Sequence, residues 1–399
     1  MKKVATATAV ATVLALAGCG QKSLSQSKSD AYDRWHHARA KVLYGAGREH
    51  LKVGQLDKAA TKTRDALGLA PDYTDARILL GKVLIEQGAY SQAGKHLEQA
   101  RGQAPESAEV HYLLAVAAEK AGDMPRALEL YRKSHALDDS GIAAIVAAGE
   151  VMVQMDRLTE ARRFIAPYLS EADGDPSIHE LAGRMAMMQG DYAEAAEQFL
   201  QAHDLDYDNY YYRESLAQAQ FLAQQYDRAA DTIENLLMMD GYEPPAWVYT
   251  MLGNTRLALG RHVGARDAFE QVTRQRPSDP IAWTNLARSA LVLGDMSRAV
   301  MWSNKALQLD TNCSEAVLLL GYSLLSDNQA HRAVRVLSEH GDRVDENPMV
   351  YWLLGRAYSA VEEPEKAKRC YGRAMELDPD HPLSKVVADG KPVRLDMLD

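Results

Sequence analysis

The sequence contains little of what a β-rich or disulfide-stabilised protein needs. Only 4 of its 399 residues are Phe and only 3 are Cys, and no run of β-branched residues lies between turn-forming residues. Strands favour β-branched and aromatic side chains, whereas helices favour the Ala and Leu that are frequent here. With 47% apolar and 25% charged residues the chain can still bury a core. These proportions predict an all-α protein.

An excess of basic charge is also absent. The chain has 45 Lys and Arg against 55 Asp and Glu, which gives a formal net charge of −10. Proteins that bind nucleic acids gain most of their sequence-independent affinity from basic groups placed on phosphates. We therefore expect no nucleic-acid partner.

Catalytic and metal-binding motifs are missing as well. The sequence has no His-Glu-x-x-His, Gly-x-Ser-x-Gly, Walker or Cys-x-x-Cys motif. His36 and His37 lie near Asp33, but no further ligand follows at useful spacing, which favours solvated side chains over a metal site. We expect neither an enzyme nor a metal, a cofactor or a small-molecule substrate.

The N-terminus has the organisation of a cleavable leader. Two lysines precede an apolar stretch, residues 4–16, that is too short to cross a bilayer permanently. The Leu-Ala-Gly-Cys sequence at residues 16–19 resembles the lipobox of bacterial lipoproteins. This resemblance implies a signal peptide over residues 1–18 and acylation of Cys19 with fatty acids such as palmitate. The alternative is an ordinary secretory signal that happens to end near a Cys.

The residues after the leader indicate where the protein would be held. In enterobacterial-type lipoproteins, a residue other than Asp after the acylated Cys implies sorting to the outer membrane, facing the periplasm, and Gly20 stands here. The polar, Ser-rich residues 21–30 favour a flexible tether, so residues 19–39 are predicted to hold the acylated Cys, this tether and a short leading helix. No later apolar run is long enough to span a membrane, so the lipid would be the only membrane attachment.

The other two cysteines, Cys313 and Cys370, could form a disulfide in such a compartment. The repeat register described next separates them by more than one repeat, beyond the roughly 7 Å between Cα atoms that a disulfide tolerates. Both are therefore predicted to be free thiols.

Alanine and small residues recur at a fixed period. An Ala recurs every 34 residues with one step of 36, at positions 59, 93, 127, 161, 195, 229, 265, 299, 333 and 367. A Gly or Ala stands twelve residues before each of these, at positions 47, 81, 115, 149, 183, 217, 253, 287, 321 and 355. Self-similarity at this period is the signature of a repeat architecture.

This register resembles the tetratricopeptide repeat (TPR) family. The small residues that allow two helices to approach closely include Gly81, Ala93, Gly253, Ala265, Gly355 and Ala367. The resemblance implies an all-α, right-handed superhelical solenoid of ten helix-turn-helix repeats over residues 40–381, followed by a tail over residues 382–399. The predicted repeats start at residues 40, 74, 108, 142, 176, 210, 246, 280, 314 and 348.

Turn residues and irregularities fit the same register. A Gly or Asn is predicted to end the first helix in seven repeats, at Gly54, Gly88, Gly122, Gly190, Gly260, Gly294 and Asn328. Repeat four is the weakest match, with Asp156 for this Gly and Tyr168 where a small residue is usual, so local irregularity is expected there. The two-residue insertion near residues 242–245 indicates either a small change of pitch or a boundary between sub-arrays.

The family resemblance also implies where a partner would bind. In TPR proteins the groove-facing side chains come from positions 2, 5, 9, 12 and 13 of each first helix. In repeats five to eight, the residues predicted here to form a partner groove are Arg184, Met187, Tyr211, Gln218, Phe221, Trp247, Asn254, Leu257, Arg288 and Leu291. Aromatic residues and Arg dominate protein–protein hot spots. The alternative is that these aromatic residues only pack between successive hairpins.

Two functions follow from the resemblance to TPR lipoproteins of pilus, secretion and exopolysaccharide-export systems. The first is an adaptor that binds other envelope proteins or extended peptide segments and supports assembly of a pilus, a secretin channel or a polysaccharide exporter. The second is a scaffold that recruits or regulates periplasmic peptidoglycan hydrolases or proteases. The short tail either caps the last hairpin or leaves its open edge for a partner.

Overall fold

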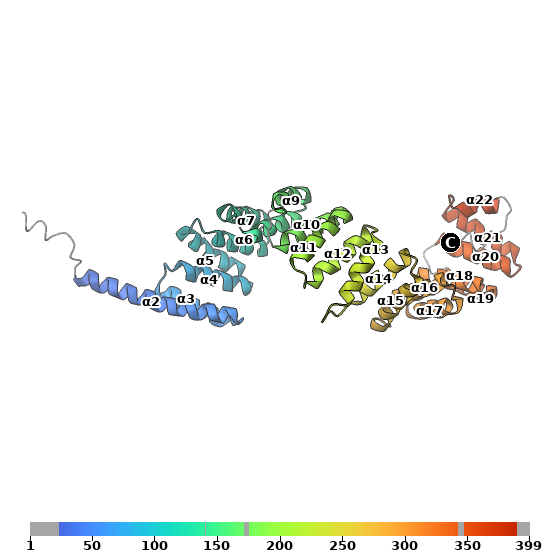
Figure 1. The fold of residues 1–399 in the computed structure, drawn as a ribbon, viewed down its shortest axis with the longest axis horizontal. Coiled ribbons are helices and arrows are strands. Elements are labelled where there is room, and N and C mark those ends of the chain that lie inside the picture. Colours follow the sequence, from blue (N-terminus) through green and yellow to red (C-terminus); the bar gives the residue numbers. More distant parts are fainter. Residues whose placement is uncertain (1–23, 140, 171–174, 342–346, 389–399) are drawn as a thin grey trace, which may run out of the picture. The chain divides into compact units, whose positions relative to one another are not determined.

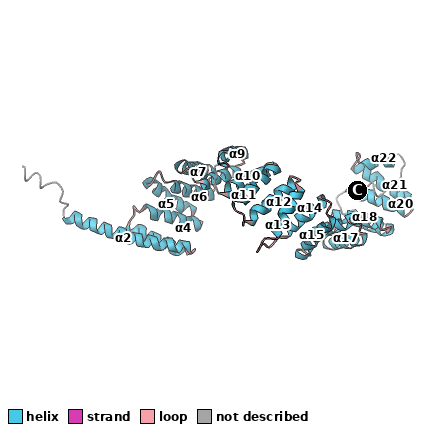
Figure 2. Cartoon of the chain, in the orientation of Figure 1, coloured by secondary structure: helices cyan, strands magenta, loops and turns pink. Residues whose placement is uncertain are grey.

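The chain folds into stacked helix pairs. The computed structural model describes residues 24–139, 141–170, 175–341 and 347–388 (Figure 1). Within these ranges the chain forms helices and no strand, as Figure 2 shows, which confirms the all-α prediction. The predicted signal peptide and Cys19 lie outside the described residues. None of the described helices has the length and apolar character needed to cross a bilayer.

The chain divides into two compact units, Met1–Leu181 and Ala182–Asp399, and the division falls within helix α10 (Pro176–Gln189). The helices of the first unit are α2 (Leu24–Lys52), α3 (Leu56–Leu69), α4 (Thr74–Glu86), α5 (Tyr90–Gln103), α6 (Ala108–Lys120), α7 (Met124–Leu137), α8 (Ile142–Gln154) and α9 (Leu158–Ile165). In each unit a hairpin packs on the next one along the chain.

The second unit continues from α10 with the same alternation of first and second helices. Its further helices are α11 (Tyr192–Leu205), α12 (Tyr210–Leu222), α13 (Tyr226–Leu237), α14 (Ala246–Ala258), α15 (His262–Gln275), α16 (Pro280–Val292), α17 (Met296–Leu309), α18 (Ser314–Ser326), α19 (Ala330–Gly341), α20 (Pro348–Ala360), α21 (Pro364–Leu377) and α22 (Pro382–Ala388). The first helices of the predicted repeats therefore begin at the predicted starts from α4 onward.

The first helix differs from its prediction. The helix α2 is continuous for 29 residues and begins at Leu24, inside the segment for which a flexible tether was predicted. The short leading helix and the first helix of repeat one are thus a single element. Leu24, Gln26 and Lys28, which alternate with the serines, have high helix propensity, and the packing of the C-terminal half of α2 on α3 stabilises a helix that extends towards the N-terminus.

Close approach inside the hairpins explains the periodic small residues. A Cβ atom built on Gly253 would lie 2.5 Å from the ring of Phe269, and one on Gly355 would lie 2.4 Å from the ring of Tyr371. On Gly81 the same atom would lie 2.5 Å from the side chain of Leu97. Each of these distances is far below van der Waals contact, so only Gly lets the second helix place a large side chain there. The partner alanines Ala93 and Ala265 are fully buried and Ala367 is nearly so.

The turn between the two helices of each repeat has one conformation throughout. The fifteenth residue of each of the ten repeats lies in this turn and has a positive φ, at residues 54, 88, 122, 156, 190, 224, 260, 294, 328 and 362. The next N–H donates to the carbonyl five residues earlier, as in Gln55 to His50 at 2.9 Å and Gln225 to Gln220 at 2.9 Å, which is the Schellman motif. Four of these residues are not Gly, and Gln224 and Glu362 carry no sequence signal for a left-handed conformation.

Repeat four is irregular, as predicted. Helix α9 has only 8 residues and passes into a 3-10 turn at Ala166–Tyr168, with Pro167 near its start. Pro has no N–H to donate and Tyr168 is too large for the usual close approach, so the second helix cannot continue as an α-helix. The division into units falls in the following repeat and not at the two-residue insertion.

The tail covers the last hairpin within the described residues. In helix α22 the side chain of Leu383 is 2% exposed, and Val386 and Val387 pack against the same core as Trp352 of α20. The ring of His381 lies 5.3 Å from that of Trp352. These contacts favour local capping over an open edge. The thiols Cys313 and Cys370 are free, in agreement with the prediction.

Candidate functional site

The first helices of repeats five to eight expose large apolar side chains at two repeat positions. At position 2, Tyr211 is 47% exposed and Trp247 is 38% exposed, as a binding surface would require. Ile281 occupies the same position in α16 and is also exposed. All three residues lie in the first turn of their helices, in the second unit.

Position 13 provides a second row. Met188, Leu222 and Val292 stand at this position in α10, α12 and α16, and all three are exposed. Eleven residues are just over three full turns, so both rows lie on the same side of the first helices, about 16 Å apart along the helix. We call the two rows together the α10–α16 surface: Tyr211, Trp247, Ile281, Met188, Leu222 and Val292. The last four residues were not predicted from the sequence, although the same position rule selects them.

The predicted position-12 residues have a different role. Met187, Phe221, Leu257 and Leu291 are partly buried and pack against core clusters of the second unit. The alternative reading, packing between successive hairpins, therefore describes these four residues better than a free groove does. The sequence could not separate the two because one apolar residue serves either purpose at this position.

Polar residues lie between the two rows, at position 9. Gln218 is exposed, while Arg184 and Asn254 are half-buried. Arg288 is occupied within the chain, since its Nε donates to Glu315 of α18 at 2.8 Å. This ion pair joins the first helices of repeats eight and nine, so Arg288 stabilises the stack as well as lying beside the apolar rows.

The insertion near residue 242 is held by tyrosines. The hydroxyl of Tyr210 donates to the carbonyl of Asp240 at 2.7 Å, and that of Tyr242 donates to the carboxylate of Glu214 at 2.6 Å. Burial, followed by Glu214, raises the pKa of Tyr242. The two rings lie 5.1 Å apart. Tyr210 therefore fixes the loop, and the neighbouring Tyr211 is the exposed member of the Tyr triplet.

The first unit has a pocket on its own first helices. A cavity of about 580 Å³ is lined by α2, α4 and α6, with Leu51, Ile85, Tyr112 and Val116 among its apolar walls. Lys82, at its edge, forms an ion pair of 2.5 Å with Glu109. This pocket was not predicted from the sequence, although the same repeat positions applied to repeats one to three select Leu51, Ile85 and Val116.

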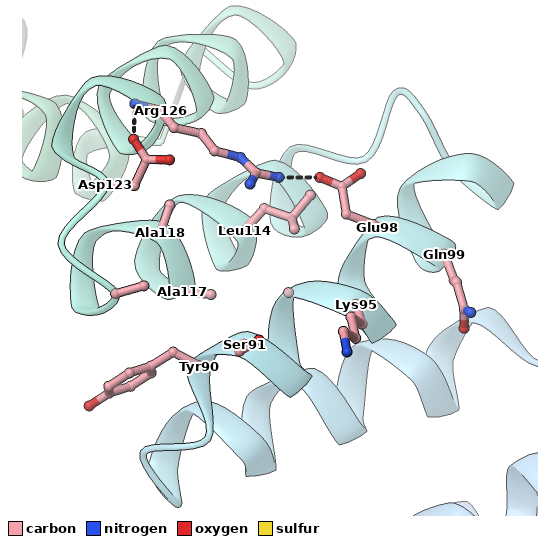
Figure 3. Close-up of a pocket in the computed structure, with 12 residues that line it drawn as sticks. Tyr90, Ser91, Lys95, Glu98, Gln99, Leu114, Ala117, Ala118, Asp123 and Arg126 are labelled. Carbon is pink, nitrogen blue, oxygen red and sulfur yellow. Dashed lines mark hydrogen bonds and ion pairs between the residues drawn. The ribbon is translucent and has the colours of Figure 1, made fainter.

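A second hollow of the first unit lies between α5, α6 and α7 (Figure 3). Ala117 and Ala118 of α6 are among the residues that line it, and the guanidinium of Arg126 reaches across to Glu98 of α5 at 2.7 Å. The hollow exists because Gly94 and these alanines leave space that larger residues would fill. It is a gap between successive repeats.

Comparison with known proteins settles the family. Models described as tetratricopeptide repeat match residues 50–117 and 118–185, residues 153–243 and 250–313, and residues 348–381. Together they cover most of the chain, and the last match coincides with the predicted tenth repeat. The chain belongs to the tetratricopeptide repeat family.

The sequence relatives of this TPR chain are distant. It is 21% identical over 391 residues to the TPR repeat-containing protein MJ1428 of Methanocaldococcus jannaschii, covering 90% of this chain and 66% of that protein. It is 24% identical over 352 residues to the protein CTR9 homolog of Arabidopsis thaliana, covering 83% of this chain and 32% of that protein. The chain therefore spans less than two thirds of the relatives' length.

Solved structures with the same kind of fold include YrrB, described as a TPR protein with an unusual peptide-binding site. That match has a TM-score of 0.41 and 21% identity, and covers 49% of this chain and 99% of YrrB. The Cut9–Hcn1 structure matches with a TM-score of 0.42 and 12% identity, covering 88% of this chain and 96% of that chain.

TPR arrays generally act as non-catalytic scaffolds for protein–protein interaction. Among the described residues, no three His, Cys, Asp or Glu side chains are grouped to hold a metal ion. The ring of His36 lies against Tyr32 at 4.1 Å, and that of His37 lies 5.4 Å from Tyr73. The buried Arg213 is 3.1 Å from His203 and lies over the ring of Tyr207. These contacts are packing contacts within α2, between α2 and the first repeat, and between later repeats.

Proposed function

We infer that this TPR chain is a lipid-anchored interaction scaffold of the bacterial cell envelope. It is attached through Cys19 to the periplasmic face of the outer membrane and supports assembly of a pilus, a secretin channel or a polysaccharide exporter. The TPR fold supports the scaffold, and the lipobox-like residues 16–19 support the anchor. The partner is another envelope protein, bound through an extended segment.

The α10–α16 surface carries this proposal. Isolated exposed apolar residues are common on proteins, but six of them at two repeat positions on one side of adjacent first helices form a pattern that packing does not require. Tyr and Trp are the residue types that dominate binding energy at protein interfaces. The exposed Tyr211 and Trp247 are therefore its expected anchors.

The spacing of the two rows describes the partner. An extended chain advances about 3.3 Å per residue, so the ~16 Å between the rows corresponds to apolar residues about five apart in the bound segment. Gln218 and Asn254, which lie between the rows, offer hydrogen bonds to the backbone of that segment.

The test is crosslinking in cells, followed by affinity capture and mass spectrometry. The native chain is compared with Tyr211→Ala/Trp247→Ala and with a control, Val263→Ala/Met301→Ala, which changes two exposed apolar residues on the second helices α15 and α17. We expect a subunit of a pilus, secretin or exporter to be captured by the native and control chains and lost with the Tyr211/Trp247 variant.

Other outcomes separate the parts of the proposal. Capture of hydrolases or proteases would contradict a role in assembling an envelope machine and would support the recruitment of those enzymes as the function. An unchanged set of partners in the Tyr211/Trp247 variant would exclude the α10–α16 surface. The anchor is tested separately by metabolic labelling with a palmitate analogue, which we expect to label the native chain and not the Cys19→Ala chain.

A further inference from the structure

One face of α2 is covered by nothing in the described part of the chain. Tyr32 is 62% exposed, Trp35 is 53% exposed and Val42 is 72% exposed. Lys28 and Arg39 are exposed on the same helix, and the guanidinium carbon of Arg39 lies 5.4 Å from the ring centre of Trp35. We call these five residues the outer face of α2.

The outer face points away from the repeats. At 100° per residue, Lys28, Trp35, Arg39 and Val42 fall within about 40° of Trp35 around the helix axis. The fully buried Ala40, which packs towards α3, lies about 140° away. The two acidic residues of this segment, Asp30 and Asp33, also lie on the far side, about 140° and 160° from Trp35. The outer face is therefore apolar, aromatic and basic.

The position of α2 in the stack explains why this face is open. Val42 stands at position 3, which in later repeats packs against the preceding hairpin. The buried residues at this position are Ala76, Val110, Ala144, Ile178, Val248, Ala282, Ala316 and Val350. Repeat one has no preceding hairpin in the described residues, so its position 3 and the helical extension before it lack a partner from the chain.

We propose that the outer face of α2 lies on the surface of an anionic lipid membrane. Trp and Tyr favour the boundary between headgroups and acyl chains, and Lys and Arg keep their charges among anionic headgroups while their stems contact apolar surface. This proposal rests on the proposed anchor for proximity. Four residues, 20–23, separate Cys19 from the start of α2 at Leu24, and the five steps between the two Cα atoms span at most about 18 Å.

The experiment uses the chain without its leader and with Cys19→Ser, so that no acyl chain contributes to binding. Its partition is measured by flotation with vesicles of phosphatidylglycerol and phosphatidylethanolamine in equal parts, and with vesicles of phosphatidylcholine alone. We expect binding to the anionic vesicles, a decrease of about tenfold with Trp35→Ser, and a decrease of about fivefold with Arg39→Gln.

The matched control is Met301→Ser, which removes an equally exposed apolar side chain from α17. We expect Met301→Ser to bind like the parent chain. Brominated lipids should quench the tryptophan fluorescence of the parent chain and of Met301→Ser to the same extent, and should quench that of Trp35→Phe less. Equal weakening by Met301→Ser, or no binding to anionic vesicles, would overturn the proposal. So would a dimer that Trp35→Ser dissociates without any lipid binding, because a second copy would then occupy the face. Because the assay needs no acylation, its result is independent of the labelling of Cys19.

Discussion

The first helices of the two units present different surfaces although they are built on the same repeat. In the first unit, α2, α4 and α6 enclose an apolar pocket beside the Lys82–Glu109 ion pair. In the second unit, α12, α14 and α16 place Tyr211, Trp247 and Ile281 in solvent. Both surfaces use groove-facing positions of the same repeat, but the pocket residues Leu51 and Ile85 stand at position 12 and the exposed residues stand at position 2. The difference shows that residues at the variable positions, and not the repeat itself, decide what a TPR surface can bind.

The largest expected effect comes from filling the close approach inside a hairpin. Gly253→Ala in the second unit should lower the free energy of unfolding by about 3 kcal/mol, because the rigid, buried ring of Phe269 cannot move away. Gly81→Ala in the first unit should lower it by only about 1–2 kcal/mol, since Leu97 can change rotamer. Urea denaturation followed by circular dichroism measures both.

Matched controls exist in each unit. Gly68 of α3 and Gly372 of α21 have no atom within 4 Å of a new Cβ. Replacing either with Ala should stabilise its helix by up to about 1 kcal/mol. If Gly68→Ala destabilised the chain as much as Gly253→Ala, close approach would not be the cause.

Partner binding should separate the two surfaces. Trp247→Ala should weaken the affinity for the captured partner by about 2 kcal/mol, roughly thirtyfold, because truncating a central aromatic anchor removes its buried area. Ile85→Ala in the pocket of the first unit should change the same affinity by less than about threefold. Isothermal titration calorimetry with the partner segment checks both. A larger loss of affinity with Ile85→Ala than with Trp247→Ala would place the binding site in the first unit.

The turns offer a smaller test that applies to both units. Asp156→Gly in the first unit and Gln224→Gly in the second should each raise the free energy of unfolding by about 0.5–1 kcal/mol, because a left-handed conformation is unfavourable for residues with a Cβ. Gly54→Ala and Gly260→Ala, which create that penalty, should lower it by about 1 kcal/mol. In thermal denaturation, the two substitutions to Gly should therefore raise the melting temperature and the two substitutions to Ala should lower it.

The smallest expected effect is a dependence of stability on pH. Burial, followed by Arg213, lowers the pKa of His203, and burial, followed by Arg77 and Arg64, lowers that of His96. Just below the ordinary His pKa of about 6.5, the unfolded chain therefore binds more protons than the folded chain. The free energy of unfolding should decrease as the pH falls from 7.5 to 5.5. Urea denaturation at both pH values should show a smaller decrease for His203→Gln and for His96→Gln, and an unchanged decrease would contradict the prediction.

Much of the fold was predictable because it depends on local and periodic information. Gly81, Ala93 and their equivalents recur at a fixed period and allow two helices to pack closely. The later first helices begin at the residues that this spacing predicted. The non-Gly turns were harder to predict. Gln224 adopts a left-handed conformation because the two helices it joins pack together, and no property of Gln indicates this.

The candidate site was only partly predictable for a related reason. A position rule selected Tyr211 and Trp247, but it also selected Phe221 and Leu257, which pack against the core, and Arg288, which pairs with Glu315. Exposure depends on which side chains the neighbouring repeats supply. The position rule also selects the pocket residues of the first unit and the exposed position-13 residues, but whether such residues enclose a pocket or stay in solvent depends on contacts about 34 residues apart.

By itself, then, the sequence determined the helical class, the register of the repeats and the places where two helices must approach, because these depend on residue size at a fixed period. Only the tertiary structure decided which apolar residues stay in solvent, where α2 begins, and which first helices enclose a pocket. Those outcomes depend on the volume and charge that adjacent repeats bring to one place, and a single repeat does not contain that information.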